Sequence, residues 1–277
     1  MGINKILYIV ILYNQKFENT NVYISLLSKI DNIKDIYIWD NSLNELLNQD
    51  LLDKGYNYIY SKNNMGVSYP YNRGLEYAMK NDYRWVTFLD QDTIFPATYL
   101  SILHSSLNEN PDIKLFCPRH KINNERFLSP VKAICNITRL SIKRIQGKFP
   151  IRKYSVINSG LTIKMELYVL TGGYNEKVFL DYSDFEFIKR CSQVIDNGFC
   201  LDIDCIQDFS NEQRDTTLLL KRLILFCCSV KGCNKKECKD FVGYNLVVLK
   251  RIFSLSFRLK SFKPFGIYYK YYLLKSK

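Results

Sequence analysis

The chain lacks several features that define large classes of protein. No stretch reaches the roughly 18 uninterrupted apolar residues that a membrane span needs, and the best candidate, residues 218–230, is interrupted by Lys221 and Arg222. The apolar run at residues 6–13 is followed at once by Asn14, without a small-residue cleavage site. We therefore expect a buried strand there rather than a signal peptide, and no membrane span.

The cysteines also lack a familiar pattern. There are nine, an odd number, and none forms a Cys-x-x-Cys pair. Secreted domains pair their cysteines, so a reducing cytoplasm is the expected compartment. Four of the nine cluster near the C-terminus, at Cys227, Cys228, Cys233 and Cys238. Their spacing does not match that of a zinc knuckle, which favours buried free thiols over a metal site.

The positive charge is concentrated in the last quarter of the chain. Residues 1–214 contain 25 Lys and Arg against 24 Asp and Glu, whereas residues 215–277 contain 14 against 3. We expect a folded domain over residues 1–214 and a basic, aromatic, helical extension over residues 215–277. Such an extension attracts phosphates, either of nucleic acid or of an anionic membrane leaflet.

The order of apolar runs in the first 120 residues predicts an α/β fold. Strand-like runs alternate with helical stretches, which is typical of a parallel sheet with helices on both faces. The pattern becomes loose and basic over residues 118–154, where we expect a loop-rich or hairpin insertion. The expected strands are residues 6–13, 35–40, 56–60, 84–89 and 155–163, and the expected helices are 17–30, a stretch after 41–42, 67–80, 183–197 and most of the chain beyond 214.

Acidic residues follow two of these strands. Asp40 closes one strand, and Asp90 and Asp92 follow another. In open α/β sheets the ligand lies beyond the carboxyl ends of the strands, so one crevice can gather these carboxylates. Two carboxylates at positions i and i+2 suit Mg²⁺ or Mn²⁺ bridging a diphosphate. The alternative is a solvated turn, because Asp-x-Asp is frequent by chance.

Further polar groups accompany these carboxylates. Gly66 lets the backbone approach a ligand closely, and Arg73 suits a phosphate. The stretch from Gly172 to Arg190 holds an acidic cluster at the start of an expected helix, where a carboxylate can act as a general base. Ordinary helix capping is the alternative for that cluster.

Together and in this order, these stretches resemble family 2 inverting glycosyltransferases of the GT-A fold, especially the bacterial rhamnosyltransferase-like branch. The resemblance covers about residues 5–205. It implies a GT-A (Rossmann-like) mixed sheet flanked by helices, with the basic helical extension appended. The matching stretches are Val10 to Asn14, Trp39 to Ser42, Asn64 to Val67, Asn72 to Gly74, Leu89 to Thr93, Asn158 to Gly160, and Gly172 to Asp184.

The resemblance also implies roles for individual residues. Asp184 would be the general base, although Ser183 replaces the first acid of the family's Glu-Asp pair, which leaves Asp181 as an alternative. Asp92, with Asp90 nearby, would ligate the metal. The family's late histidine ligand is missing from residues 205–208, where Gln207 or Asp208 would substitute. The nucleotide-sugar-binding set would be Tyr13, Asn14, Asp40 (on the base), Asn64, Gly66, Asn72, Arg73, Asp90, Ser159 and Gly160.

The expected function is transfer of a hexose, with rhamnose as one candidate, from a nucleotide-diphosphate sugar to a lipid-linked glycan acceptor. The enzyme would lie on the inner face of the cell membrane, held by its basic extension on anionic lipid. A nucleotidyltransferase on a related fold would need a glycine-rich loop after the first strand, and residues 13–16 contain no glycine. A basic nucleic-acid-binding module would leave the acidic cluster unexplained, so no nucleic-acid partner is expected.

Overall fold

The computed structural model describes residues 5–122, 126–134, 137–207 and 215–274, and its centre is a mixed β-sheet. The strands of this sheet are β1 (Ile6–Leu12), β2 (Ile36–Asp40), β3 (Asn57–Tyr60), β4 (Trp85–Asp90), β5 (Thr93–Ile94), β6 (Leu115–Lys121), β7 (Phe127–Ser129), β10 (Gly147–Pro150), β12 (Thr162–Lys164) and β13 (Asn197–Gln207). Their order is β10-β13-β6-β12-β4-β1-β2-β3, with β5 paired to β13 and β7 to β6.

The half of the sheet formed by β1 to β4 is parallel. Leu12 lies opposite Asp40, and Ile11 lies opposite Asp90, so these strands end at one edge of the sheet. On the other side of β4, β12 runs antiparallel to both β4 and β6. This arrangement confirms the expected α/β mixed sheet, and it places the acidic strand ends side by side.

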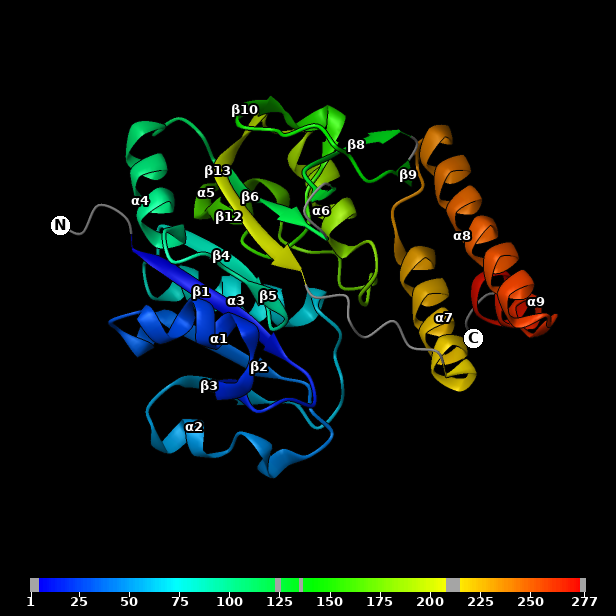
Figure 1. The fold of residues 1–277 in the computed structure, drawn as a ribbon, viewed down its shortest axis with the longest axis horizontal. Helices are drawn as coiled ribbons and strands as arrows, with labels where there is room; N and C mark the ends of the chain where they lie inside the picture. Colours follow the sequence, from blue (N-terminus) through cyan, green and yellow to red (C-terminus); the bar gives the residue numbers. More distant parts are fainter. Residues whose placement is uncertain (1–4, 123–125, 135–136, 208–214, 275–277) are drawn as a thin grey trace.

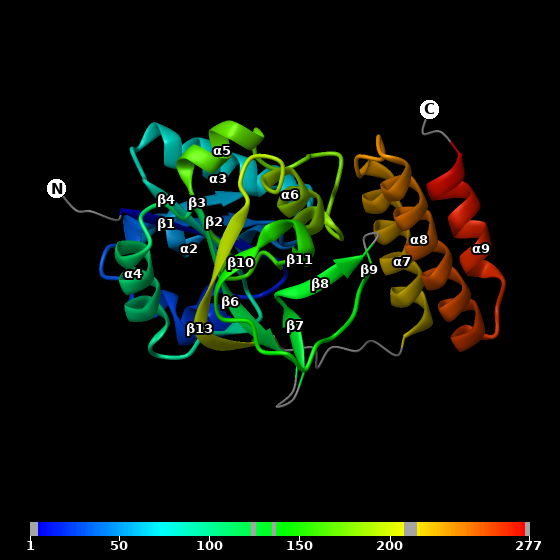
Figure 2. The same cartoon turned by 90° about the horizontal axis from the view of Figure 1, so that it is seen from above.

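Helices cover both faces of the sheet (Figure 1 and Figure 2). Side chains of β1 alternate between two apolar clusters: Val10 belongs to the cluster that contains residues of α4, and Ile9 belongs to the cluster that contains residues of α3, α5 and α6. Alternation of this kind is what a strand buried on both faces requires. The helices are α1 (Asn21–Ser25), α2 (Asp50–Asp53), α3 (Ser68–Lys80), α4 (Tyr99–Glu109), α5 (Met165–Thr171) and α6 (Ser183–Cys191), joined by the 3₁₀ turns η1 (Phe17–Asn19), η2 (Leu27–Lys29), η3 (Ile33–Asp35), η4 (Glu45–Leu47) and η5 (Ile151–Lys153).

Several expected elements differ in the structure. The helix expected over residues 17–30 is divided into η1, α1 and η2, because Thr20 begins α1 as its N-cap and Leu26 leaves helical backbone angles. The strand expected over residues 155–163 is interrupted before β12, where Gly160 turns the chain with φ of +72°. The 11-residue strand β13, which follows the expected helix region, was not predicted.

The insertion over residues 118–154 is rich in loops and hairpins, as expected. Besides β7 and β10 it contains β8 (Val131–Ile134) and β9 (Ile137–Thr138). These form a small second sheet in the order β11-β8-β9, where β11 is Tyr154–Ser155. Figure 2 shows this sheet between the main sheet and the C-terminal helices.

The C-terminal helices form a layer at one end of the molecule (Figure 1). They are α7 (Thr216–Gly232), α8 (Cys238–Leu259), α9 (Lys263–Ile267) and the π-helical turn η6 (Tyr268–Leu273). Their apolar core includes Val178 from the α/β part, and a side chain at Gly232 would lie 2.0 Å from the carbonyl oxygen of Lys177. The layer is thus packed closely against the segment before α6.

Two further features of these helices bear on the sequence expectations. Cys227 and Cys233 are buried and unpaired, as expected, but Cys228 and Cys238 are exposed. No helix among the described residues combines the length and apolar character that crossing a membrane requires. The expected boundary at residue 214 falls in residues 208–214, which lie outside the described residues.

Candidate active site

Three carboxylates from separate parts of the chain gather at the carboxyl edge of the sheet. Asp90 ends β4, Asp92 follows in the turn, and Asp184 lies in the first turn of α6. Burial and the nearby charges of Asp92 and Asp184 raise the pKa of Asp90 well above its ordinary value. Burial, with a contribution from the Asp181 charge, raises the pKa of Asp184 to about 7. The site is therefore crowded with negative charge, which favours a cation or a proton.

A chain of hydrogen bonds fixes Asp90 and Asp92. The hydroxyl of Ser159 accepts from the backbone N–H of Asp90 (3.2 Å) and donates to Thr93 Oγ1 (2.8 Å). Thr93 Oγ1 in turn donates to Gln207 Oε1 (2.7 Å), and Gln207 Nε2 donates to Asp92 Oδ1 (2.7 Å). The turn before β12, the short strand β5 and the end of β13 thus position the two carboxylates together.

Tyr71 is a site residue that sequence reasoning missed. Its fully buried hydroxyl donates to Asp90 Oδ1 at 3.3 Å. Burial and the Asp90 charge raise the pKa of Tyr71, so it remains a hydrogen-bond donor at neutral pH. Tyr71, Leu75 and Ala78 recur at helical spacing on the buried face of α3. This spacing is the sequence signal that could have identified Tyr71 as a residue that faces the interior.

The loops after β1 and β2 meet at the same edge. The backbone N–H of Tyr13 donates to Gln91 Oε1 (2.8 Å), and that of Asn14 donates to Ser42 Oγ (2.8 Å). The side chain of Asn14 accepts from the backbone N–H of Leu43 (2.9 Å). The structure thus brings Tyr13 and Asn14 beside the loop that carries Asp90 and Asp92, and both side chains are exposed.

Asp40 lies beneath this edge rather than on its surface. Its side chain is fully buried, Oδ1 accepts from the backbone N–H of Ser42 (2.8 Å), and Oδ2 accepts from Asn48 Nδ2 (2.7 Å) and the Tyr58 hydroxyl (3.1 Å). These bonds order the loop after β2. Contact of Asp40 with a nucleotide base stays a prediction.

Gly66 and Gly160 are required by contacts within the chain. Gly66 has φ of +70°, its N–H donates to Asn64 Oδ1, and an added Cβ would lie 2.0 Å from the carbonyl oxygen of Phe179. An added Cβ at Gly160 would lie 2.6 Å from Pro118 Cγ. Gly66 was expected to admit a ligand, and the group that approaches it closely here is the segment leading into α6.

Asn72 and Arg73 are not brought to the carboxylates. The Asn72 side chain donates to Tyr174 O and to Glu176 Oε1 (both 2.9 Å) and accepts from the Tyr174 N–H. The Arg73 guanidinium pairs with Glu76 (2.6 Å) and with Glu176 (3.5 Å). Both residues tie α3 to the loop over residues 173–176, and a phosphate contact of Arg73 stays a prediction.

The two candidate bases have different partners. Asp181 forms an ion pair with Arg222 of α7 at 2.8 Å, and its carboxylate is partly buried. Asp184 accepts a hydrogen bond from the Phe185 N–H (2.8 Å). Burial raises the pKa of Asp181, against the opposing charges of Arg222 and Arg251. Because Arg222 already holds the Asp181 carboxylate, whereas no ion pair among the described residues holds Asp184, the geometry favours Asp184 over Asp181 as the proton acceptor.

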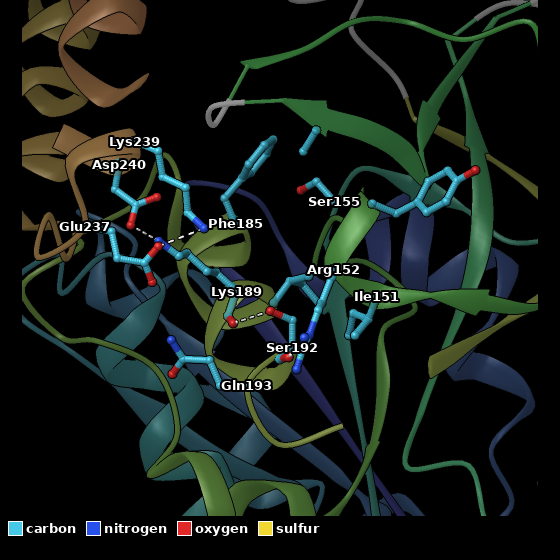
Figure 3. A pocket seen from close by; sticks show the side chains of 13 residues that line it. Ile151, Arg152, Ser155, Phe185, Lys189, Ser192, Gln193, Glu237, Lys239 and Asp240 are labelled. Carbon is cyan, nitrogen blue, oxygen red and sulfur yellow. Dashed lines mark hydrogen bonds and ion pairs between the residues drawn. The ribbon is translucent and has the colours of Figure 1, made fainter. Parts of the chain in front are cut away.

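Asp184 faces a cavity of about 770 Å³ between the α/β part and the C-terminal helices. The α/β wall includes Asp90, Asn158, Asp181 and Asp184. A second cavity, of about 420 Å³, lies between α6 and the start of α8, where Lys189 forms an ion pair with Asp240 (Figure 3). No candidate site residue lines that second cavity, whereas Asp90, Asp181 and Asp184 line the larger one.

Comparison with known proteins identifies the family. The model of the family described as Glycosyl transferase family 2 matches residues 9–165, which is more than half of the chain. The chain belongs to glycosyl transferase family 2. This assignment confirms the resemblance inferred from the sequence motifs, and it supports neither the nucleotidyltransferase nor the nucleic-acid-binding alternative.

Individual relatives of this glycosyl transferase family 2 protein are distant. It is 26% identical over 188 residues to the dTDP-rhamnosyl transferase RfbF of Shigella flexneri, a match that covers 66% of this chain and 62% of the relative. Among solved structures, the mannosyltransferase PcManGT from Pyrobaculum calidifontis, in complex with GDP-Man and Mn²⁺, shares the fold with a TM-score of 0.55 and 11% identity, over 91% of this chain and 72% of that chain. S. aureus TarS, in complex with UDP-GlcNAc, has a TM-score of 0.48 and 16% identity, over 90% of this chain and 73% of that chain.

The donor groups of this family 2 site fit a hard divalent cation only in part. Within the described ranges, no group of three or more His, Cys, Asp or Glu side chains is arranged to hold a metal ion. Asp90 and Asp92 offer carboxylate oxygens, whereas Gln207 turns its amide N–H toward Asp92 and positions it. Asp208, the other proposed substitute ligand, lies outside the described residues. Mg²⁺ or Mn²⁺ would therefore take its remaining ligands from a diphosphate and water.

Proposed function

We propose that this protein is an inverting hexosyltransferase that transfers a sugar from a nucleotide diphosphate to a hydroxyl of a cell-surface polysaccharide precursor. The observation that carries the proposal is the shared cavity of Asp184 and Asp90, beside Asp92, in a chain that belongs to glycosyl transferase family 2. A carboxylate with a pKa of about 7 is suited to accept a proton near neutral pH.

In the proposed reaction, Asp184 accepts the proton of the acceptor hydroxyl. The hydroxyl oxygen forms a bond to the anomeric carbon on the face opposite the diphosphate. The bond from the anomeric carbon to the diphosphate oxygen breaks, and the nucleoside diphosphate leaves with the electron pair. One displacement of this kind inverts the anomeric configuration. The Phe185 N–H, which donates to Asp184 Oδ1, stabilises the ionised form of the base.

We propose that Asp92 and Asp90 bind Mg²⁺ or Mn²⁺, which when bound neutralises charge on the departing diphosphate. Tyr71 and Gln207 are positioning residues, because they fix the two carboxylates by hydrogen bonds at 3.3 and 2.7 Å. Tyr13, Asn14 and Asn64, on neighbouring loops, are proposed to bind the nucleotide sugar, together with the buried Asp40 beneath them. The similarity to a dTDP-rhamnosyl transferase makes dTDP-rhamnose the first donor to test.

A panel of nucleotide sugars in the presence of Mn²⁺ tests the proposal. A donor at a hundred times its dissociation constant stabilises the fold by about 2.7 kcal/mol, which raises the melting temperature by several degrees. We expect one nucleotide-sugar class to do so, and the shift to disappear with EDTA or in Asp92→Ala. Transfer that persists undiminished with EDTA present would contradict the metal proposal, and the absence of any shift or turnover across the panel would contradict the proposed function.

We further propose that the enzyme acts at the cytoplasmic face of the cell membrane on a lipid-linked acceptor. Basic residues are abundant in residues 215–277, and large apolar side chains are exposed along one face of α8 and the turn after it. Exposed aromatic rings beside lysines are typical of surfaces that settle at the headgroup level of an anionic leaflet. The exposed apolar residues that make up this face and the turn are Val242, Leu246, Phe253, Phe257 and Phe262.

A further inference from the structure

The wall of the large cavity opposite Asp184 is basic. Residues of α7 and α8 that are spaced by three or four positions point into it, so each helix contributes one face. Among the lining residues of this wall are four cations, namely Arg222, Lys250, Arg251 and Arg258. Four basic residues of the extension thus line the same cavity as the proposed catalytic base.

Three of these cations form no ion pair with a described carboxylate, although the charge of Arg251 acts on Asp181. Arg222 pairs with Asp181, but within the part of the chain that the structure describes no ion pair involves Lys250, Arg251 or Arg258. The Nε atom of Arg251 is buried and has no hydrogen-bond acceptor among the described residues, while its guanidinium lies over the Phe226 ring at 4.6 Å. A buried donor without an acceptor costs free energy, and an anionic ligand in the cavity would supply that acceptor.

The position of the cavity indicates which substrate brings the anion. Asp184 must contact the acceptor hydroxyl, and it lines the same cavity as the cations. By contrast, Tyr13, Asn14, Asp40 and Asn64, the proposed nucleotide contacts, are not among the residues that line it. The cations therefore lie on the acceptor side of Asp90 rather than on the nucleotide side.

We propose that Lys250, Arg251 and Arg258, assisted by Arg222, bind a phosphate or diphosphate group of the acceptor. This inference rests on the proposed function, because it takes Asp184 as the base. Clustered Arg and Lys side chains are the groups that bind phosphate most strongly, through charge-assisted hydrogen bonds. The exposed apolar face of α8 adjoins the face that carries these cations, so a phosphate at a membrane surface is within reach of the cavity.

Binding of two small probes by the full chain, in EDTA and without donor, tests this site separately from catalysis. Hexyl diphosphate represents a lipid diphosphate, glycerol 3-phosphate represents a phosphate on the glycan itself, and hexanol is the uncharged comparison. We expect at least one phosphate probe to bind in titration calorimetry, and hexanol not to bind. Tighter binding of hexyl diphosphate would indicate a lipid diphosphate as the source of the anion, and tighter binding of glycerol 3-phosphate would indicate a phosphate on the glycan.

The decisive variant is the double substitution Lys250→Gln with Arg258→Gln, both at exposed positions. Its matched control is Lys221→Gln with Lys263→Gln, which removes the same charge from exposed positions that do not line the cavity. Loss of a charge-assisted hydrogen bond weakens binding by roughly tenfold or more, so we expect at least a tenfold weaker affinity in the first variant and an unchanged one in the control. Arg251→Gln alone should show the same loss.

The proposal would be overturned if the two double variants bound the phosphate probes equally well, whether both kept or both lost affinity. It would also be overturned if hexanol bound as strongly as the phosphate probes. Donor-dependent melting shifts with Mn²⁺ should be normal in all of these variants, since none alters Asp90 or Asp92. A chain that binds the phosphate probes but fails to respond to any nucleotide sugar would keep this inference as a phosphate site and reject the proposed function.

Discussion

Asp184 combines a partly buried position with a hydrogen bond from the Phe185 N–H, and it faces a cavity large enough for a sugar acceptor. Asp181, three residues earlier, is held by Arg222 instead. The chemistry of the two carboxylates therefore differs because of their partners, although the sequence presents them as near equivalents.

Asp184→Asn should lower the transfer rate by about 10²–10⁴, the usual contribution of a positioned base. Donor binding should be unchanged, because the amide keeps the shape of the side chain. The measurement is single-turnover transfer together with the donor-induced melting shift. Asp181→Asn is the matched control, with a small loss of rate expected; the reverse ranking would assign the base to Asp181.

The raised pKa of Asp184 predicts a pH dependence of both activity and stability. Transfer should rise with pH and level off above about pH 7, as the base ionises. For stability the sign is opposite, because the folded pKa lies above the unfolded value. The protonated side chain favours the fold, and that stability is lost as pH rises through about 7.

The variant Asp184→Asn mimics the protonated side chain. It should melt at a higher temperature than the wild type at pH 8, and this advantage should shrink by pH 5. Each 1 kcal/mol corresponds to about 2–4 °C for a chain of this size. A melting difference that does not change between pH 5 and pH 8 would show that Asp184 is ionised at both values.

At the scale of secondary structure, the turn before α3 and the segment before α6 are fixed by a backbone contact. Gly66 has a left-handed backbone, its carbonyl accepts from the Asn41 side chain, and the Val67 N–H donates to Phe179 O. This contact joins the loop after β3 to the segment that leads to Asp184. The distance of Asp184, the proposed base, from the sheet edge therefore depends on this contact.

Gly66→Ala should destabilise the fold and lower the transfer rate. A left-handed backbone at a residue with a side chain costs about 1–3 kcal/mol, and the added Cβ would also meet Phe179 O at 2.0 Å. Gly147→Ala is the control, since its φ is +72° but no atom lies within 4 Å of an added Cβ. Urea unfolding should show the larger loss for Gly66→Ala; equal losses would mean that the segment containing Phe179 moves aside.

At the scale of the whole molecule, the helical layer presents one apolar face outward and one basic face to the cavity. Phe257 and Phe262 are 89% and 85% exposed, and Lys260 and Lys263 lie beside them in the sequence. The layer cannot be removed cleanly at residue 214 to test its role, because Val178 and Lys189 of the α/β part pack or pair with it. Point variants are the sharper tool.

Phe257→Ser with Phe262→Ser should weaken co-sedimentation with vesicles that contain anionic lipid, while leaving the fold intact. Ile142→Ser is the control, since Ile142 is 82% exposed but lies outside the extension. Binding of the wild type should fall as salt is raised, because juxtamembrane basic residues contribute about 1 kcal/mol each. Equal sedimentation with neutral vesicles, or no sedimentation with either, would reject the membrane surface.

Much of the fold could be predicted from local pattern. The strands β1 to β4 and the helix α3 were placed to within a residue or two, because a buried strand and an amphipathic helix have distinct periods. The regions that were misplaced depend on local breaks or distant pairing. Residues 155–163 break at Gly160, and β13 exists because β6 and β10 lie on either side of it.

The sequence by itself determined the family and the acidic strand ends, since motif order and strand period are properties of neighbouring residues. Only the tertiary structure decided how these residues are used. It paired Asp181 with Arg222, buried Asp40, joined Asp92 to Gln207, and placed Arg251 and Asp184 in the lining of one cavity. The reason is physical: the pKa and the accessibility of a side chain depend on charges and burial supplied by segments far apart in the chain, and no local pattern records which segments meet.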